Sequence, residues 1–361
     1  MSTLRLARYQ FRNGMRSFTR IFVPYVKSRI LNTRLRPVVS ILFTDWRCNI
    51  DCHYCYQFDN HREGMSLETA KSSIDWLKSV GCKVIALMGG EPLVRRKFIL
   101  EVIRYGTSNG SFVYLPTNGR LLTRDYIDAL GEAEVSAINL AVDCIEEKPG
   151  LPKALMAIEP QFRYLVRKQE EYGYILFFNI NITSVNLKDA KMLTEIAHDE
   201  GMAIDYHINE APHNMVDVDH YRRDRDGLYV RPDQYEEVDE LLDWIIAKNR
   251  KGYTMVNSIA HLEAIKDRIR NRPLKWNCGA GQNGILIRPD GSLSPCFDLI
   301  TYDHDWGKIW EPRFDPQALE EIKQKCVPHC LSTCFYTTAH YYQPCESLKW
   351  VAKHVRIGSV R

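Results

Sequence analysis

The chain has 361 residues, of which 45% are hydrophobic, and its formal net charge is only +3 at pH 7. This length suits a barrel-sized domain with an extension, and the small net charge excludes a protein that binds polyanions over its whole surface. No apolar run approaches the ~20 residues of a membrane-spanning helix, and no secretory signal is visible. The eleven cysteines therefore favour metal ligation in a reducing compartment over disulfides, which predicts a cytoplasmic protein.

Residues 1–37 form a basic segment. The first 40 residues hold nine Arg or Lys and no acidic residue, and an apolar stripe runs beside arginines at helical spacing. This pattern predicts an amphipathic helix that ends near Pro24. The helix either docks on the body of the protein or lies on the anionic inner face of a membrane, as a peripheral contact. Binding to nucleic acid is the less favoured alternative, since no base-stacking pattern accompanies the arginines.

Residues 38–215 alternate between apolar strands and amphipathic helices, which predicts parallel βαβ units. In such folds the chemistry lies at the carboxyl ends of the strands. A charged connection or lid with two helices follows over 216–277. The expected strands are 38–43, 84–88, 111–115, 135–142, 174–182 and 203–208, and the expected helices are 66–80, 122–130 and 187–201.

A three-cysteine loop follows the first expected strand. Cys48, Cys52 and Cys55 have three and then two residues between them, so a short loop can bring their thiolates to one metal centre. Iron–sulfur clusters of electron carriers use four cysteines, so three would leave one iron open. An open position distinguishes a reactive metal site from a structural one. A zinc site or a set of buried thiols would be the alternatives.

Polar residues follow several of the other strands. Gly89, Gly90 and Glu91 come directly after the second strand, where glycines allow close backbone approach and a carboxylate can accept an ammonium. Candidate cofactor-binding residues at later strand ends are Asn118, Asp143 and Asn181. Asp143 could instead cap a helix. Cys144 could return a hydrogen atom to a substrate radical, although such a cysteine is more often a small buried residue.

These motifs resemble the radical S-adenosylmethionine (SAM) superfamily, whose signature is C-x3-C-x2-C with an aromatic residue, here Tyr54, before the last cysteine. The resemblance implies a partial (β/α)6 barrel and a 4Fe–4S cluster whose open iron binds SAM. It implies that Gly89, Gly90 and Glu91 hold the SAM amino group. An electron donor such as flavodoxin or ferredoxin would then drive cleavage of SAM to a 5′-deoxyadenosyl radical, which abstracts hydrogen from a substrate or adds to it.

Residues 278–361 form a cysteine-rich extension, in which an Asp-Gly turn at Gly291 predicts a β-hairpin. It resembles the auxiliary-cluster regions called twitch and SPASM, which carry seven cysteines when complete. Here there are six: Cys278, Cys296, Cys326, Cys330, Cys334 and Cys345. The resemblance favours one auxiliary iron–sulfur cluster on Cys278, Cys296, Cys334 and one of the other three. The alternatives are a zinc site and two clusters, in which one iron lacks a protein ligand or His329 serves as a ligand.

We therefore expect a radical SAM enzyme, an oxidoreductase or a transferase. The basic helix favours a lipid or another membrane-associated substrate. The alternatives are modification of a ribosomal peptide and dehydrogenation of a sugar or alcohol. A non-enzyme, either an iron–sulfur electron carrier or a zinc-stabilised binding module, would leave Gly89-Gly90-Glu91-Pro92 unexplained.

Overall fold

The structure is a computed structural model that describes residues 37–209, 227–300 and 304–341. The expected basic helix, residues 210–226 and Cys345 lie outside these residues, whereas the two helices expected in the connection are described. Within them, no helix has both the length and the apolar character needed to cross a membrane.

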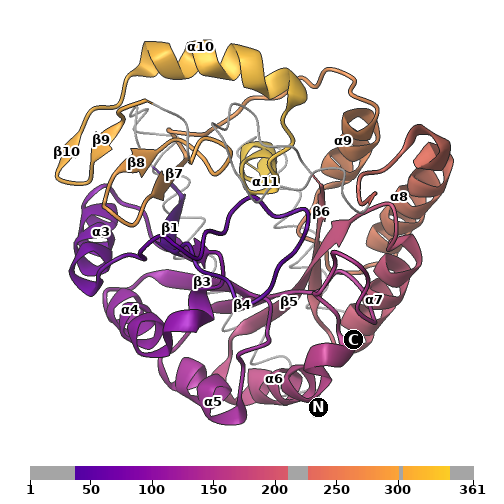
Figure 1. Cartoon of the computed structure of the whole chain (residues 1–361), viewed down its shortest axis with the longest axis horizontal. Coiled ribbons are helices and arrows are strands. Elements are labelled where there is room, and N and C mark those ends of the chain that lie inside the picture. Colours follow the sequence, from indigo (N-terminus) through magenta and orange to yellow (C-terminus); the bar gives the residue numbers. More distant parts are fainter. Residues whose placement is uncertain (1–36, 210–226, 301–303, 342–361) are drawn as a thin grey trace.

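A curved, mostly parallel sheet forms the centre of the described chain (Figure 1). The strand order is β6-β5-β4-β3-β2-β1-β7-β8, and β1 to β6 pair in parallel in chain order. This arrangement confirms the expected partial barrel. The six strands are β1 (Val39–Asp45), β2 (Val84–Gly89), β3 (Phe112–Thr117), β4 (Ala137–Ala141), β5 (Ile175–Ile182) and β6 (Ala203–Ile208).

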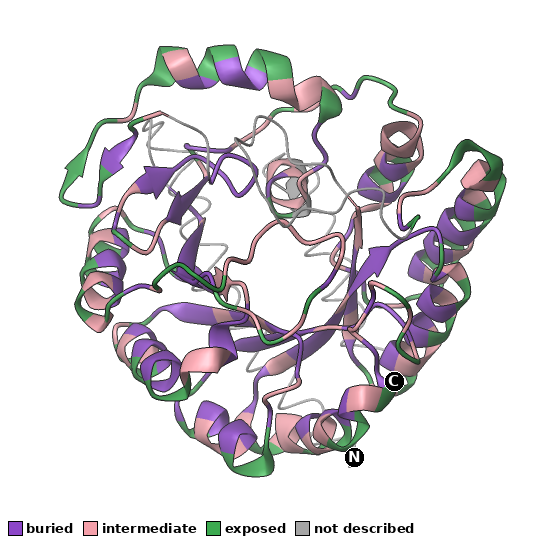
Figure 2. Ribbon diagram, viewed as in Figure 1, coloured by how far each residue is buried: buried purple, intermediate pink, exposed green. Residues whose placement is uncertain are grey.

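Helices cover the outside of the sheet, with their buried faces turned inward (Figure 2). The structure adds two that sequence patterns did not indicate, α4 and α6, and neither has a side-chain N-cap. By contrast, the Ser66 hydroxyl accepts a hydrogen bond from the backbone N–H of Thr69 at 3.0 Å and caps α3 as expected. The helices are α3 (Leu67–Ser79), α4 (Arg96–Ser108), α5 (Arg124–Glu132), α6 (Glu159–Tyr172), α7 (Leu187–Asp199), α8 (Tyr235–Arg250) and α9 (Ile259–Ile269), with short 3-10 turns at η2 (Pro92–Arg95), η3 (Met156–Ile158) and η4 (Pro232–Gln234).

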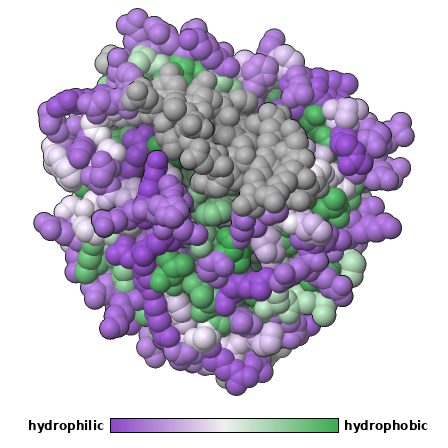
Figure 3. All heavy atoms as spheres, viewed as in Figure 1, coloured by the Kyte–Doolittle hydropathy of each residue, from purple (hydrophilic) through white to green (hydrophobic). Residues whose placement is uncertain are grey.

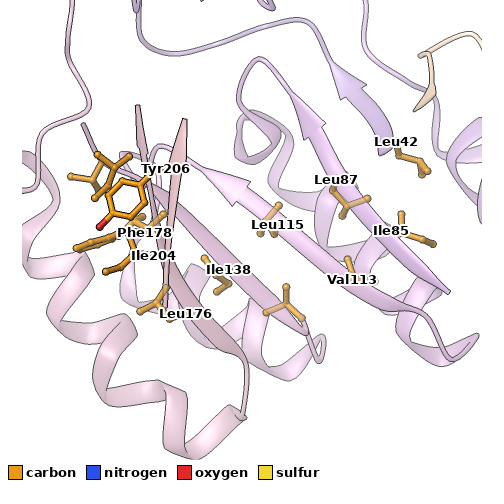
Figure 4. Close-up of a cluster of buried hydrophobic side chains, with 14 of the residues drawn as sticks. Leu42, Ile85, Leu87, Val113, Leu115, Ile138, Leu176, Phe178, Ile204 and Tyr206 are labelled. Carbon is orange, nitrogen blue, oxygen red and sulfur yellow. The ribbon is translucent and has the colours of Figure 1, made fainter. Parts of the chain in front are cut away.

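The main core lies between the sheet and these helices. Side chains alternate across each strand, so Ile138 and Leu140 face the helices while the residues between them face the barrel interior. Figure 4 shows the outward set, which includes Leu87, Leu115 and Phe178. A smaller apolar group inside the barrel forms its floor: Val84, Phe112, Ala137 and Phe177. On the surface shown in Figure 3, hydrophilic residues dominate the periphery.

The cysteine-rich extension continues the barrel sheet. Strand β7 (Gly284–Ile287) pairs in parallel with β1, and β8 (Leu293–Ser294) pairs antiparallel with β7. The predicted hairpin is thus confirmed, with Gly291 at φ +80° in its turn. In Figure 1, α11 (Thr333–Tyr341) lies between the β7–β8 hairpin and β6. The other elements of the extension are β9 (Gly307–Lys308), β10 (Glu311–Pro312), α10 (Pro316–Cys326) and η5 (Val327–His329).

Candidate functional site

The loop between β1 and α3 carries Cys48, Cys52 and Cys55. Burial is the main cause that raises the pKa of all three thiols, to about 11 for Cys48. The charges of Cys48 and Cys55 further raise the pKa of Cys52, and that of Cys55 raises the pKa of Cys48. A cluster that binds deprotonated cysteines offsets this cost of burying thiolates.

The donors around these sulfurs suit a cluster. The backbone N–H of Gln57 donates to Cys55 Sγ at 3.5 Å, and hydrogen bonds of this kind tune iron–sulfur centres. Among the described residues, no three His, Cys, Asp or Glu side chains are placed to bind a single metal ion. A four-iron cluster takes one cysteine per iron, so it requires a different spacing of the sulfurs.

The cysteine loop is attached to the loop after β4. The Tyr54 hydroxyl donates to Asp143 Oδ2 at 2.6 Å, and the backbone N–H of His53 donates to the Gly150 carbonyl at 3.0 Å. Asp143 Oδ1 also accepts from the backbone N–H of Asn181 at 2.9 Å. The Asp143 carboxylate therefore joins the cysteine loop to the ends of β4 and β5.

Glu91 lies buried at the end of β2, where the backbone and a hydroxyl orient its carboxylate. Its Oε1 accepts from the Leu93 N–H at 3.0 Å and from the Thr117 hydroxyl at 2.8 Å, and its Oε2 accepts from the Asn118 N–H at 2.8 Å. Burial raises the pKa of Glu91, and these three donors oppose that shift. The Asn118 side chain also donates to Asn49 Oδ1 at 2.9 Å. One chain of hydrogen bonds thus connects the cysteine loop, Asn118 and Glu91.

The two glycines before Glu91 have a packing reason that the sequence did not reveal. A Cβ at Gly89 would lie 2.3 Å from the Asp45 carbonyl oxygen, and one at Gly90 would lie 2.4 Å from the Arg47 carbonyl oxygen. The backbone N–H groups of Gly90 and Glu91 donate to these same two oxygens, both at 2.8 Å. The glycines therefore let the end of β2 pack directly on the approach to the cysteine loop.

Lys153 was not expected from the sequence. Burial lowers its pKa, but the negative charges of Cys52, Asp143 and Cys55 raise it, and the net shift is upward. Its Nζ lies 5.3 Å from the centre of the Tyr54 ring. Lys153 thus supplies a positive charge beside the three cysteines. It belongs to no sequence motif, and only the fold brings it here.

Cys144 is fully buried behind this site. Its thiol donates to the Leu151 carbonyl at 3.5 Å and packs with Leu151, Ala154 and Leu228. Burial raises its pKa to about 12. These contacts favour a structural thiol over a hydrogen-atom donor.

A second group of cysteines surrounds one cavity in the extension. Its lining includes Cys278, Cys296, Cys326 and Cys330. The backbone N–H of Ser332 donates to Cys330 Sγ at 3.4 Å. The lining also includes the buried Lys323, whose charge opposes the effect of burial on the pKa of Cys278 and Cys326. The cavity also includes Asp298, whose Oδ2 accepts from the Cys330 thiol at 3.8 Å and whose charge opposes that of Lys323. The four thiols fit a cluster bound by four cysteines.

Cys334, which was expected among the auxiliary ligands, does not line this cavity. Cys334 is an exposed residue of α11. Desolvation of its thiol, followed by the charges of Asp205 and Asp298, raises the pKa of Cys334 to about 12. The structure thus groups Cys326 and Cys330 together with Cys278 and Cys296, and it separates Cys334 from them.

Comparisons with known proteins agree with this geometry. Residues 47–185 match the family model described as the Radical SAM superfamily. The chain is 30% identical to an AdoMet-dependent heme synthase from Methanosarcina barkeri, over 77% of this chain and 84% of that protein. The chain belongs to the radical SAM superfamily. It is also 22% identical to a PqqA peptide cyclase from Bradyrhizobium diazoefficiens, over 76% of this chain and 73% of that protein.

The fold of this radical SAM chain resembles that of Streptococcus suis SuiB, solved with its precursor peptide SuiA. The TM-score is 0.62 at 14% identity, with 86% of this chain and 73% of that chain covered. Its relatives are enzymes, and so is this protein. Members of the superfamily use a 4Fe–4S cluster and SAM, as the sequence resemblance implied.

Proposed function

We propose that Cys48, Cys52 and Cys55 hold the catalytic 4Fe–4S cluster and that the end of β2 holds SAM beside it. The observation that carries this assignment is the hydrogen-bonded connection from the cysteine loop through Asn118 to Glu91. When bound, the cluster supplies the electron that cleaves SAM and so starts hydrogen abstraction from a substrate or addition to it.

The chain's own residues have distinct roles in this proposal. Each Glu91 oxygen has further capacity as an acceptor, so the carboxylate can receive the SAM ammonium group while its present donors keep it oriented. Gly89 and Gly90 hold Glu91 at the cysteine loop, as the packing of their backbone indicates. Asp143, oriented by Tyr54, and Asn181 offer polar groups at the neighbouring strand ends. Lys153 offsets the negative charge of the cysteines.

Anaerobic reconstitution, iron counting and a SAM-cleavage assay test the catalytic site. Replacement of Cys52 by alanine should remove about four irons per chain and abolish cleavage. Cys82→Ala is the matched control, because Cys82 is equally buried but lies in the core between α3 and β2. It should keep both the iron and the activity. Full iron content and cleavage in the Cys52→Ala protein would refute the assignment.

We further propose one auxiliary cluster on Cys278, Cys296, Cys326 and Cys330. With two clusters, the reconstituted protein should hold about eight irons. Cys330→Ser should hold about four, whereas Cys334→Ser should keep all of them. Loss of iron from Cys334→Ser with none from Cys330→Ser would favour the ligand set expected from the sequence. A zinc site predicts zinc in place of the second set of irons.

A reductant such as flavodoxin or ferredoxin is the proposed electron donor. We also propose that the substrate is a lipid or another membrane-associated molecule. The support is the pattern of charged and apolar residues in residues 1–36. Flotation with anionic liposomes, comparing the wild type with a deletion of residues 1–24, tests it. Equal flotation of the two would refute it.

A peptide substrate is the second candidate. It draws support from two similar proteins, a PqqA peptide cyclase and SuiB, which was solved with its precursor peptide. Dehydrogenation of a sugar or alcohol is the remaining alternative. Mass spectrometry of reactions with a lipid extract, with a peptide library and with a mixture of sugars and alcohols separates these three classes, because each class predicts a product in only one of the mixtures.

A further inference from the structure

A hydrogen bond joins the catalytic cysteine loop to the cavity of the extension. The Tyr56 hydroxyl donates to Asp298 Oδ1 at 2.9 Å, although the two residues are 242 positions apart. Tyr56 directly follows Cys55 in the sequence, and Asp298 lines the cavity that holds the second group of cysteines. The bond therefore connects a residue beside the proposed catalytic cluster with a charged residue of the proposed auxiliary site.

The packing around Tyr56 holds this hydroxyl in place. The half-buried ring of Tyr56 packs against an apolar group formed by strands of the barrel and by the extension. Phe297, the neighbour of Asp298, belongs to the same group. On the other side of Tyr56, the backbone N–H of Gln57 donates to Cys55 Sγ at 3.5 Å. Both ends of the Tyr56–Asp298 bond are thus anchored by neighbouring residues.

Asp298 is buried beside a proposed cluster ligand. Only 9% of the residue is exposed, and its Oδ2 accepts from the Cys330 thiol at 3.8 Å. A cluster binds this sulfur as a thiolate, so Oδ2 would lose that donor when the site is filled. The carboxylate would then lie next to an anionic centre, with Tyr56 as the donor to its other oxygen. The buried Lys323 lines the same cavity and opposes the charge of Asp298.

This arrangement bears on how readily a cluster in the cavity gains an electron. Reduction makes an iron–sulfur cluster more negative, so a neighbouring negative charge opposes it and lowers the reduction potential. A hydrogen bond donated to the carboxylate draws off part of its charge and weakens that effect. Asp298 and Tyr56 would therefore act in opposite directions on the same potential.

We propose that Asp298 lowers the reduction potential of the auxiliary cluster and that Tyr56, placed by the catalytic loop, limits this effect. Both act through the cluster's protein ligands, so they are positioning residues. The inference rests on the proposed function, specifically on an auxiliary cluster bound by four cysteines. It makes the potential of that cluster depend on the loop that holds the catalytic cluster, so the two sites are coupled.

Redox titration of the anaerobically reconstituted protein, followed by EPR with dithionite as the one-electron reductant, tests the proposal. The Cys52→Ala background, which should keep only the auxiliary cluster, identifies the midpoint potential that belongs to it. Asp298→Asn should raise this midpoint by at least about 59 mV, which is a tenfold change in the ratio of reduced to oxidised cluster. An unchanged or lower midpoint would overturn the proposal.

Two further variants control for the removed charge. Asp298→Glu keeps the carboxylate and should restore a midpoint close to that of the wild type. Glu321→Gln removes an exposed charge from α10, the helix that carries Lys323, and should leave the midpoint unchanged. A shift in Glu321→Gln as large as that in Asp298→Asn would mean that the position of Asp298 has no special effect, which would also overturn the proposal.

Tyr56→Phe provides a second measurement. Loss of the hydroxyl should lower the midpoint in the otherwise unchanged protein and should have no effect in the Asp298→Asn protein, because the hydroxyl acts through the carboxylate. Equal shifts in both backgrounds would overturn the role of the bond. If Asp298→Asn fails to retain the auxiliary irons, Tyr56→Phe alone decides, and an unchanged or higher midpoint overturns the proposal.

Iron content separates this inference from the proposed function. A wild type with about eight irons, whose midpoint responds to neither substitution, would refute only this inference. A wild type with about four irons, or with zinc in the second site, would remove the auxiliary cluster itself.

Discussion

Replacement of Gly90 by alanine tests whether the end of β2 must pack directly against the cysteine loop. The new Cβ would lie 2.4 Å from the Arg47 carbonyl oxygen and 2.7 Å from that of Trp46, and both are backbone atoms. Ordinary contacts begin at 3.4 Å, so the two segments must separate by about 1 Å. The hydrogen bonds from the Gly90 and Glu91 N–H groups, both 2.8 Å long, would then be lost.

The expected cost follows from these two bonds. A buried backbone group left without its partner costs about 1–3 kcal/mol, so we expect a loss of about 3 kcal/mol in the free energy of unfolding. Gly201→Ala is the control, because Gly201 has a positive φ of +70° but no atom within 4 Å of the added Cβ. Its cost should be only the backbone strain, about 1 kcal/mol.

Urea denaturation of the iron-free proteins measures both variants, and equilibrium dialysis after anaerobic reconstitution measures SAM binding. Gly90→Ala should lose SAM affinity as well as stability, because Glu91 moves with the backbone, whereas Gly201→Ala should bind SAM normally. A Gly90→Ala protein as stable as Gly201→Ala would show that the close packing of the two segments is unimportant and would refute the reasoning.

Three further substitutions test the charges around the site. Tyr54→Phe removes the 2.6 Å donor to Asp143 and should cost about 1–3 kcal/mol in urea denaturation; an unchanged midpoint would contradict this. Burial raises the pKa of Asp143, so its contribution to stability is present below about pH 4 and is lost as pH rises through the raised pKa. Asp143→Asn should flatten this fall in stability above about pH 4, and an unchanged slope would argue against it. Lys153→Met should weaken SAM binding about tenfold, because the substitution leaves the negative charges around Lys153 uncompensated. The exposed control Lys83→Met should bind SAM normally. Equal SAM affinities of the two variants would exclude an electrostatic role for Lys153.

Local patterns were sufficient to predict the partial barrel, its parallel strands and the likeness to the radical SAM superfamily. The spacing of Cys48, Cys52 and Cys55 and the position of Glu91 after a strand depend on residues close in sequence. Alternating strands and helices then indicate a parallel sheet, which brings strand ends to one mouth whatever the detailed packing. The sequence patterns missed α4 and α6, and the absence of a side-chain N-cap does not explain this, because α5 and α7 also lack one and were predicted.

Only the tertiary structure decided which distant side chains meet. The Ser40 hydroxyl donates to the Ile285 carbonyl, 245 positions away, where the extension joins the barrel sheet. Lys153 lies beside the cysteines, and Cys330 lines the cavity that Cys334 does not, because of how loops and helices pack. Spacing along the chain determines local geometry, whereas contacts between distant segments depend on closure of the sheet and on the space left by neighbouring side chains.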